Sequence, residues 1–173
     1  MIGRTEADEV LPDLLAPGLR LVFCGTGAGP ASARLGHYYA GRGNRFWEML
    51  HRSGLTPRCF QPAQFRELLP LGIGLTDVAK LAWGLDHQLP AEELGATARD
   101  RLLAKVEGLR PRILAFTSKR AARAALGRVA GYGPQPLLFG ATLPWVLPSP
   151  SGLARRSWDE RPWLDLGKRF RTL

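Results

Sequence analysis

The chain has 173 residues, 45% of them hydrophobic and 9% aromatic, which fits a single domain with one core. No apolar run approaches the roughly 18 residues that span a bilayer, and the polar start MIGRTEADEV does not resemble a signal peptide, so a cytoplasmic protein is expected. Two cysteines, Cys24 and Cys59, exclude a disulfide framework and, within one chain, a four-cysteine zinc site or iron–sulfur cluster. Chemistry without a metal is therefore expected.

The net charge is unevenly distributed along the chain. Residues 1–109 hold 12 Lys and Arg against 12 Asp and Glu, whereas residues 110–173 hold 12 against 3, so the whole formal charge of +9 lies in the C-terminal part. Such an asymmetry indicates a polyanionic partner such as nucleic acid. A GC-rich genome is the competing explanation, because 20 of the 24 basic residues are Arg beside 20 Gly and 14 Pro.

Apolar runs and turn residues predict strands that alternate with helices. Strands are expected at 19–24, 72–77, 112–118 and 144–148, and helices are expected to begin at Asn44, at Pro90, after Ser118 and near Asp159. This alternation favours a parallel α/β sheet, in which ligands collect at the carboxyl ends of the strands. The candidate site segments are therefore residues 25–32, 77 onward, 118 onward and 148–155.

The glycines after the first strand do not form a nucleotide-binding motif. A GxGxxG fingerprint that begins with Gly25 and Gly27 needs a third glycine where Pro30 stands, and no strand-end acid follows about 20 residues later. A Walker loop is excluded because the chain contains no GK[ST].

Four motifs together resemble the uracil-DNA glycosylase superfamily, and within it the mismatch-specific uracil and thymine DNA glycosylases. They are VFCGTGAGPASA (22–33), GNRFW (43–47), GIGLTD (72–77) and VLPSPSGLAR (146–155), in family order and at family-like spacing. The resemblance implies a three-layer α/β sandwich over residues 15–173, with a central, mainly parallel sheet of four to five strands. Residues 1–14 would form an N-terminal extension that could be flexible. The activity implied is base excision repair by a monomer of bacterial type, without a cofactor and without a membrane: a base is flipped out of DNA and its N-glycosidic bond is hydrolysed.

Matched position by position, the family implies a base pocket in the first half of the chain. Gly25, Thr26 and Gly29 would lie under the flipped base and offer backbone N–H groups, with an ordinary glycine turn as the alternative. The small Gly29 stands where stricter uracil enzymes have a bulky ring, which implies tolerance of a 5-methyl group. Tyr39 would stack on the base. Asn44 would either hydrogen-bond the base or only cap the following helix.

The last loop resembles the family wedge that enters the duplex where the base has left. Leu153 would fill the gap, with a place in the core as the alternative. Gly152 and Arg155 would contact the partner base. Phosphate contacts are expected from Ser151, Arg156 and Lys119.

Two positions depart from the family pattern. The asparagine that holds the attacking water is replaced by Gly27, and the asparagine of the last loop is replaced by Ser149, which could donate one hydrogen bond to the departing base or be a turn residue. Asp77, expected at the end of the second strand, would orient water instead and oppose the charge of an oxocarbenium-like sugar, with a turn cap as the alternative. With a reference pKa near 3.9 it would be ionised at neutral pH unless strongly buried. His87 is the next candidate base.

The sequence thus predicts a monofunctional DNA glycosylase that removes uracil, with thymine or other modified pyrimidines as further substrates, from mismatched or single-stranded DNA. No catalytic loop holds a lysine suited to a Schiff base, so an uncut strand with an abasic site is the expected product. Lys80, three residues after Asp77, is the one lysine near enough to challenge this expectation. The rival hypothesis is a DNA-binding module of the same fold that has lost catalysis, because Gly27 and Ser149 replace family asparagines.

Overall fold

A five-stranded sheet forms the centre of the molecule, and the computed structural model describes residues 8–173. The strands are β1 (Leu21–Ala28), β2 (Ile73–Trp83), β3 (Ile113–Phe116), β4 (Gly133–Pro134) and β5 (Leu143–Val146). They lie in the order β2-β1-β3-β5-β4, and all neighbouring pairs are parallel except the short β4 with β5. The expected mainly parallel α/β sheet is confirmed.

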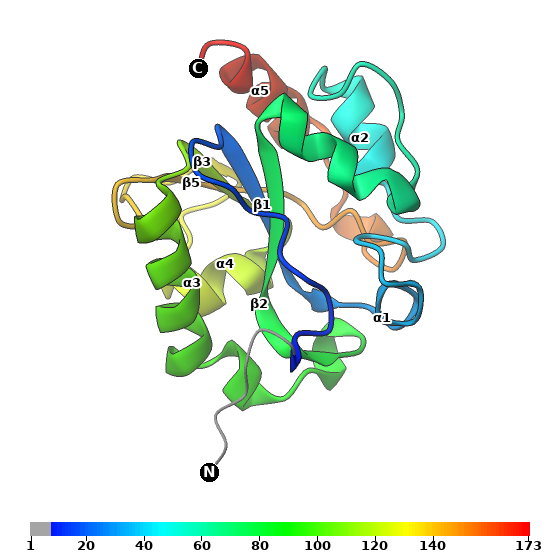
Figure 1. Cartoon of the computed structure of the whole chain (residues 1–173), viewed down its shortest axis with the longest axis vertical. Helices are drawn as coiled ribbons and strands as arrows, with labels where there is room; N and C mark the ends of the chain where they lie inside the picture. The colour runs from blue at the N-terminus through cyan, green and yellow to red at the C-terminus, as the bar shows by residue number, and fades with distance from the viewer. Residues whose placement is uncertain (1–7) are drawn as a thin grey trace.

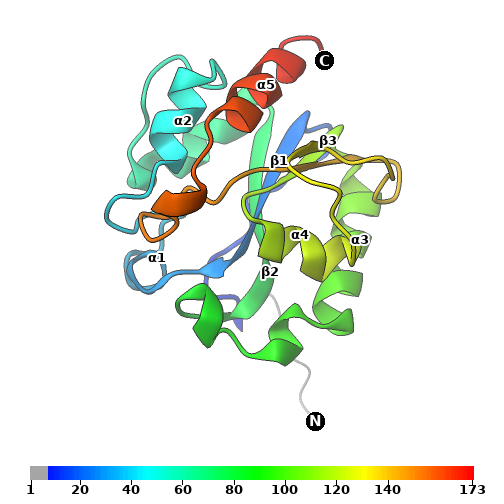
Figure 2. The same cartoon turned by 180° about the vertical axis from the view of Figure 1, so that it is seen from behind.

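Helices cover both faces of the sheet, which gives three layers (Figures 1 and 2). Side chains of β1 alternate between the two faces, so Phe23 belongs to one core and Val22 to the other. The Phe23 core is closed by α2 (Phe46–Arg52), α5 (Arg161–Phe170) and the 3₁₀ helix η2 (Pro62–Leu71); the Val22 core is closed by α3 (Ala96–Leu109) and α4 (Lys119–Leu126). The remaining short elements are α1 (Pro30–Leu35), η3 (Asp86–Gln88), η4 (Ala91–Leu94) and η5 (Arg155–Ser157). In the part of the chain that the structure describes, no helix is long and apolar enough to cross a membrane.

Three elements differ from the predicted ones by more than two residues at one end. The β1 strand runs to Ala28, so the segment expected as a glycine loop is largely strand. The β2 strand continues past Asp77 to Trp83, so the expectation that Asp77 ends a strand was wrong. Gly25 and Gly27 pair in register with Asp77 and Ala79, and this pairing uses backbone groups that a turn would leave free. The helix expected from Pro90 is interrupted, because η4 and α3 are separated by Gly95 in an extended conformation.

Residues 8–14 close the outer edge of β2. Leu14 and Leu75 exchange two backbone hydrogen bonds, and the N–H of Val10 donates to the carbonyl oxygen of Lys80. Leu11 and Leu14 are buried. An exposed strand edge is a site for unwanted pairing, and this segment covers it. The extension expected over residues 1–14 is thus packed on the sheet from residue 8 onward, and residues 1–7 lie outside the described residues.

A pair of helical glycines tests how closely α5 packs against the end of α2. A Cβ atom on Gly167 in α5 would lie 2.0 Å from the carbonyl oxygen of Ser53, whereas nothing lies within 4 Å of a Cβ on the exposed Gly108 in α3. We expect Gly167→Ala to lower the free energy of unfolding by about 1–3 kcal/mol. Gly108→Ala, the matched control, should raise it by roughly 0.5–1 kcal/mol, since alanine favours helix. Urea denaturation measures both; equal effects would contradict the close contact.

Candidate active site

A pocket of about 600 Å³ lies beside the carboxyl ends of the parallel strands. The four segments that the sequence assigned to this edge all contribute to its wall. They supply residues 25–32, Asp77 with 84–87, Thr117 with Ser118, and 149–154. Such a volume is typical of pockets for small organic groups.

Asp77 lies in the pocket wall with 6% of its surface exposed. A Cβ atom on its register partner Gly25 would stand 2.3 Å from Asp77 Oδ1, so the carboxylate can occupy this position only because residue 25 has no side chain. Within residues 8–173 the carboxylate makes no hydrogen bond or ion pair. Burial raises the pKa of Asp77 from 3.8 to about 6; Lys80 opposes this rise. The side chain is therefore strongly buried, which is the case that the sequence could not decide. It is nevertheless mostly ionised at neutral pH.

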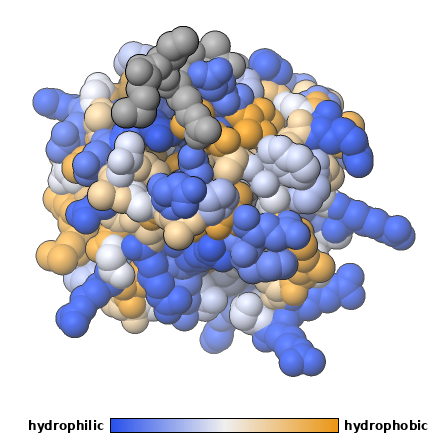
Figure 3. Space-filling view, turned by 90° about the horizontal axis from the view of Figure 1, so that it is seen from below, coloured by the Kyte–Doolittle hydropathy of each residue, from blue (hydrophilic) through white to orange (hydrophobic). Residues whose placement is uncertain are grey.

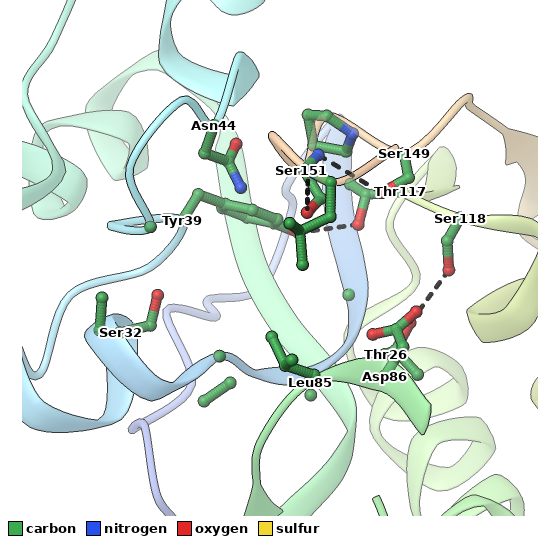
Figure 4. Close-up of a pocket in the computed structure, with 18 of the residues that line it drawn as sticks. Thr26, Ser32, Tyr39, Asn44, Leu85, Asp86, Thr117, Ser118, Ser149 and Ser151 are labelled. Atoms are coloured by element: carbon green, nitrogen blue, oxygen red, sulfur yellow. Dashed lines mark hydrogen bonds between the residues drawn. The ribbon is translucent and has the colours of Figure 1, made fainter. Parts of the chain in front are cut away.

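Tyr39 is held rigidly at the side of the pocket. Its ring stacks on Phe46 with 3.8 Å between ring centroids, and its hydroxyl shares a 3.1 Å hydrogen bond with Thr117 Oγ1 (Figure 4). Its φ of +53° is uncommon for a bulky residue and fixes the direction of the side chain. Burial and the nearby Asp77 raise the pKa of the phenol well above its ordinary value, so the ring stays neutral.

The position of Asn44 is compatible with both roles that the sequence left open for it. Its Oδ1 accepts the backbone N–H of Phe46 at 2.9 Å, at the start of α2. Its amide nitrogen has no partner among the described residues and is turned toward the pocket in Figure 4. The same side chain thus supports the helix and keeps two N–H donors available.

A polar contact between three segments forms another part of the wall. The hydroxyl of Thr26 donates to Asp86 Oδ2 at 3.4 Å and lies 3.0 Å from Ser118 Oγ (Figure 4). Ser118 also accepts the N–H of Ala121 and so caps α4. The sequence pointed to His87, which lines the pocket, but no local signal identified the Asp86 contact, since its partners lie far apart in the chain.

The two positions that depart from the family pattern both line the pocket. A Cβ atom on Gly27 would lie 3.1 Å from Leu89 Cδ1 and 3.2 Å from the Cβ of Ala79, so a side chain here would be crowded by β2. Ser149 Oγ accepts the N–H of Ser151 at 3.4 Å and keeps its own proton to donate. Around Gly29 a Cβ would meet nothing within 4 Å, so this part of the pocket is open.

Leu153 stands at the pocket rim with 78% of its surface exposed, which excludes a place in the core. The loop that carries it is docked closely on the segment before α2. A Cβ atom on Gly152 would lie 2.8 Å from the carbonyl oxygen of Arg42, and the N–H of Arg45 donates to the carbonyl oxygen of Pro150 at 2.8 Å. An apolar side chain is thus presented to solvent by a well-supported loop.

Basic side chains lie on this loop and elsewhere at the surface, and one of them, Arg42, contributes to the pocket lining. Arg155 and Arg156 are exposed, and the Arg155 Nε donates to the carbonyl oxygen of Gly152 at 3.2 Å. The ammonium group of Lys119 lies over the ring of Tyr132. Figure 3 views the end of the molecule at which β1 and β2 finish, and hydrophilic side chains predominate there, with smaller hydrophobic patches between them.

Lys80 does not belong to the pocket wall. Its ammonium group is buried and donates to the carbonyl oxygen of Leu11 at 2.6 Å, with Asp13 Oδ1 at 2.7 Å. It is therefore not a free amine. In the described part of the chain, no three His, Cys, Asp or Glu side chains are grouped so that they could hold a metal ion.

The burial of Asp77 predicts a pH-dependent cost in stability. The native state binds the Asp77 proton more tightly than the unfolded state, so this residue lowers the free energy of unfolding as pH rises from about 4 to about 6, by roughly 3 kcal/mol in all. Asp77→Asn lacks this loss. We expect the stability of the variant relative to the wild type to increase over that pH range and to level off above it, as measured by urea denaturation. Asp165→Asn, the same change on the exposed face of α5, is the control, and parallel curves for Asp77→Asn and wild type would contradict the burial.

Comparison with known proteins agrees with this architecture. A solution NMR structure of a proposed uracil DNA glycosylase from Methanosarcina acetivorans has the same fold, with a TM-score of 0.65 and 23% sequence identity over 93% of this chain and 96% of that one. Residues 12–167 match the sequence family described as the uracil DNA glycosylase superfamily. This match extends over nearly the whole described chain and includes every residue that lines the pocket except Leu11. The chain therefore belongs to the uracil DNA glycosylase superfamily.

Proposed function

We propose that this protein is a monofunctional DNA glycosylase that takes a uracil, or another modified pyrimidine, out of mispaired or single-stranded DNA and hydrolyses its N-glycosidic bond. The observation that carries the proposal is the carboxylate of Asp77, which lies in the pocket wall without a hydrogen bond from residues 8–173. A carboxylate that faces a pocket and has no partner from the described residues must be satisfied by a group within that pocket. Its retention is consistent with a partner that arrives with the substrate, such as a water molecule.

The chemistry needs few groups. Water attacks C1′ of the sugar, the bond from C1′ to the base breaks with its electron pair passing to the base, and the proton of the water passes to Asp77. The negative charge of Asp77 also opposes the positive charge that develops on the sugar. The N–H groups of Asn44 and the hydroxyl of Ser149 are donors for the oxygens of the departing base.

The open space around Gly29 supports tolerance of a substituent on the base. Tyr39, fixed by Phe46 and Thr117, supplies a rigid aromatic wall against which a flipped base can lie. An excision assay on a panel of oligonucleotides, which differ in the damaged base and in the base opposite it, would measure the mismatch preference and the range of bases removed.

The test of the function is direct. Oligonucleotides with a single uracil, in a mispair or in a single strand, are incubated with the protein and then treated with alkali. Cleavage only after alkali supports a monofunctional glycosylase. Cleavage without alkali would indicate a lyase step, and binding without any cleavage would favour a DNA-binding module that has lost catalysis.

Replacement of the carboxylate tests its role. Asp77→Asn keeps the size of the side chain but removes its charge, so we expect single-turnover excision to fall by roughly 10²-fold or more with little change in DNA affinity. Wild-type excision should also decline as the pH is lowered through about 6, because the pKa of Asp77 lies there and protonation removes the acceptor. Asp165→Asn again serves as control. Near-normal excision by Asp77→Asn would move the role to His87 or to a water held by backbone groups.

The exposed leucine of the last loop is proposed as the wedge that fills the space of the flipped base. Flipping costs a few kcal/mol in a paired duplex and less in a single strand, so Leu153→Ala should slow excision mainly from duplex DNA. Leu137→Ala is a matched control, because Leu137 is also 78% exposed but lies outside the pocket. Equal losses by Leu153→Ala on both substrates would count against a wedge.

A further inference from the structure

Four charged side chains, all buried or largely buried, form a closed ring next to the pocket. Asp13 contacts Lys80 through Oδ1 at 2.7 Å and Lys105 through Oδ2 at 2.5 Å. Glu9 contacts the same two ammonium groups, with Oε2 at 3.5 Å from Lys80 and Oε1 at 3.0 Å from Lys105. Each carboxylate thus bridges both lysines, and the ring as a whole is neutral.

The ring is built from three distant parts of the chain. Glu9 and Asp13 belong to the segment that closes the sheet edge, Lys80 to β2 and Lys105 to α3. Lys80 has 2% of its side chain exposed, whereas Lys105 has 19%. The hydroxyl of Thr76 donates a further hydrogen bond of 2.7 Å to Asp13. Removing several charged groups from water costs free energy. Apolar side chains could pack the edge segment against β2 without this cost.

The ring touches the pocket through two residues of its wall. Lys80 Nζ donates to the carbonyl oxygen of Leu11 at 2.6 Å and to the hydroxyl of Tyr38 at 3.3 Å, and both of these residues line the pocket. Tyr38 in turn donates to the carbonyl oxygen of Pro12. Lys80 follows Asp77 by three residues on β2, and side chains at this spacing project from opposite faces of a strand. The ring therefore reaches the pocket through Leu11 and Tyr38 and not through direct contact with the carboxylate.

The groups that act on the charge of Asp77 can be named from each neighbouring element. Lys80 on β2 favours the ionised carboxylate, whereas Asp13 and Glu9 of the edge segment and Asp86 of η3 disfavour it. The Tyr38 and Tyr39 phenols and the Cys24 thiol are neutral, since burial raises the pKa of each. Lys105 cancels one of the two acidic charges of the ring.

We propose that Glu9, Asp13, Lys80 and Lys105 are positioning residues for Asp77: their ring holds a cation behind the pocket, and its charge balance sets the pH at which the carboxylate is ready to accept a proton from water. The inference rests on the proposed glycosylase function for its consequence in catalysis. It assigns a role to Glu9 and Asp13 of the N-terminal segment, which do not line the pocket.

Two substitutions of opposite sign test the ring. Glu9→Gln leaves the ring with one extra positive charge, so the acid midpoint of single-turnover excision should move to lower pH by roughly 0.5 unit or more. Lys105→Gln leaves one extra negative charge, so the midpoint should move to higher pH. The double variant Glu9→Gln/Lys105→Gln restores neutrality and should return the midpoint close to that of the wild type.

The opposite signs separate an electrostatic role from a structural one. Both single variants lose ring contacts, so a structural role alone would lower excision at every pH and leave both midpoints unchanged. Lys105→Arg keeps the charge and should keep the midpoint, and Lys168→Gln removes a lysine on the exposed face of α5 as a control. Unchanged midpoints, or shifts of the same sign, would overturn the proposal.

A second measurement makes the test independent of activity. The carboxyl ¹³C chemical shift of Asp77, followed by NMR through a pH titration of the full chain, reports its ionisation directly, and circular dichroism at each pH confirms that the variant is folded. Opposite shifts in the NMR titration support the ring even if no oligonucleotide is cleaved. Absence of cleavage by the wild type would instead contradict the proposed function alone.

Discussion

An ionisable carboxylate that is almost wholly buried and makes no hydrogen bond with residues 8–173 is the constraint around which the site is built. Removing such a group from water carries a large free-energy cost, and the cost rises when other carboxylates are near. The protein meets it with a glycine that lets the side chain lie across β1, and with a buried lysine on the same strand as the carboxylate. The positions of the glycine and the lysine relative to Asp77 depend on the parallel pairing of β1 and β2. The register of the sheet therefore determines the electrostatics of the pocket.

The close backbone contacts at the pocket follow the same logic. Gly25 admits the Asp77 carboxylate, and Gly152 admits the carbonyl oxygen of Arg42. In each case two chain segments approach more closely than any side chain would allow. The pocket is consequently closely packed at both places, and on the proposed function this packing would help to hold a water molecule and a base in fixed relation.

The sequence predicted the sheet and the gathering of four segments at its edge, because apolar runs and their spacing are local signals. It did not predict that β1 continues through Gly25 and Gly27, since a run of small residues after an apolar strand is typical of a loop and the pairing that makes it a strand comes from β2. Leu153 was separated from the core correctly by its polar neighbours. The ring of Glu9, Asp13, Lys80 and Lys105 had no signal in the sequence, because its contacts join residues that are far apart in the chain and each residue type is common on surfaces.

The charge of the pocket differs in sign from that of the chain as a whole. Asp77 and Asp86 line a cavity in a protein whose formal charge is +9, with Arg42 as a cation that contributes to the lining. The overall charge therefore favours the approach of a phosphate group to the molecule, whereas the excess of one negative formal charge in the cavity favours an uncharged ring there. On the proposed function, such an arrangement would disfavour free nucleotides and would leave the cavity open to a base whose phosphates are held outside by the strand that carries it.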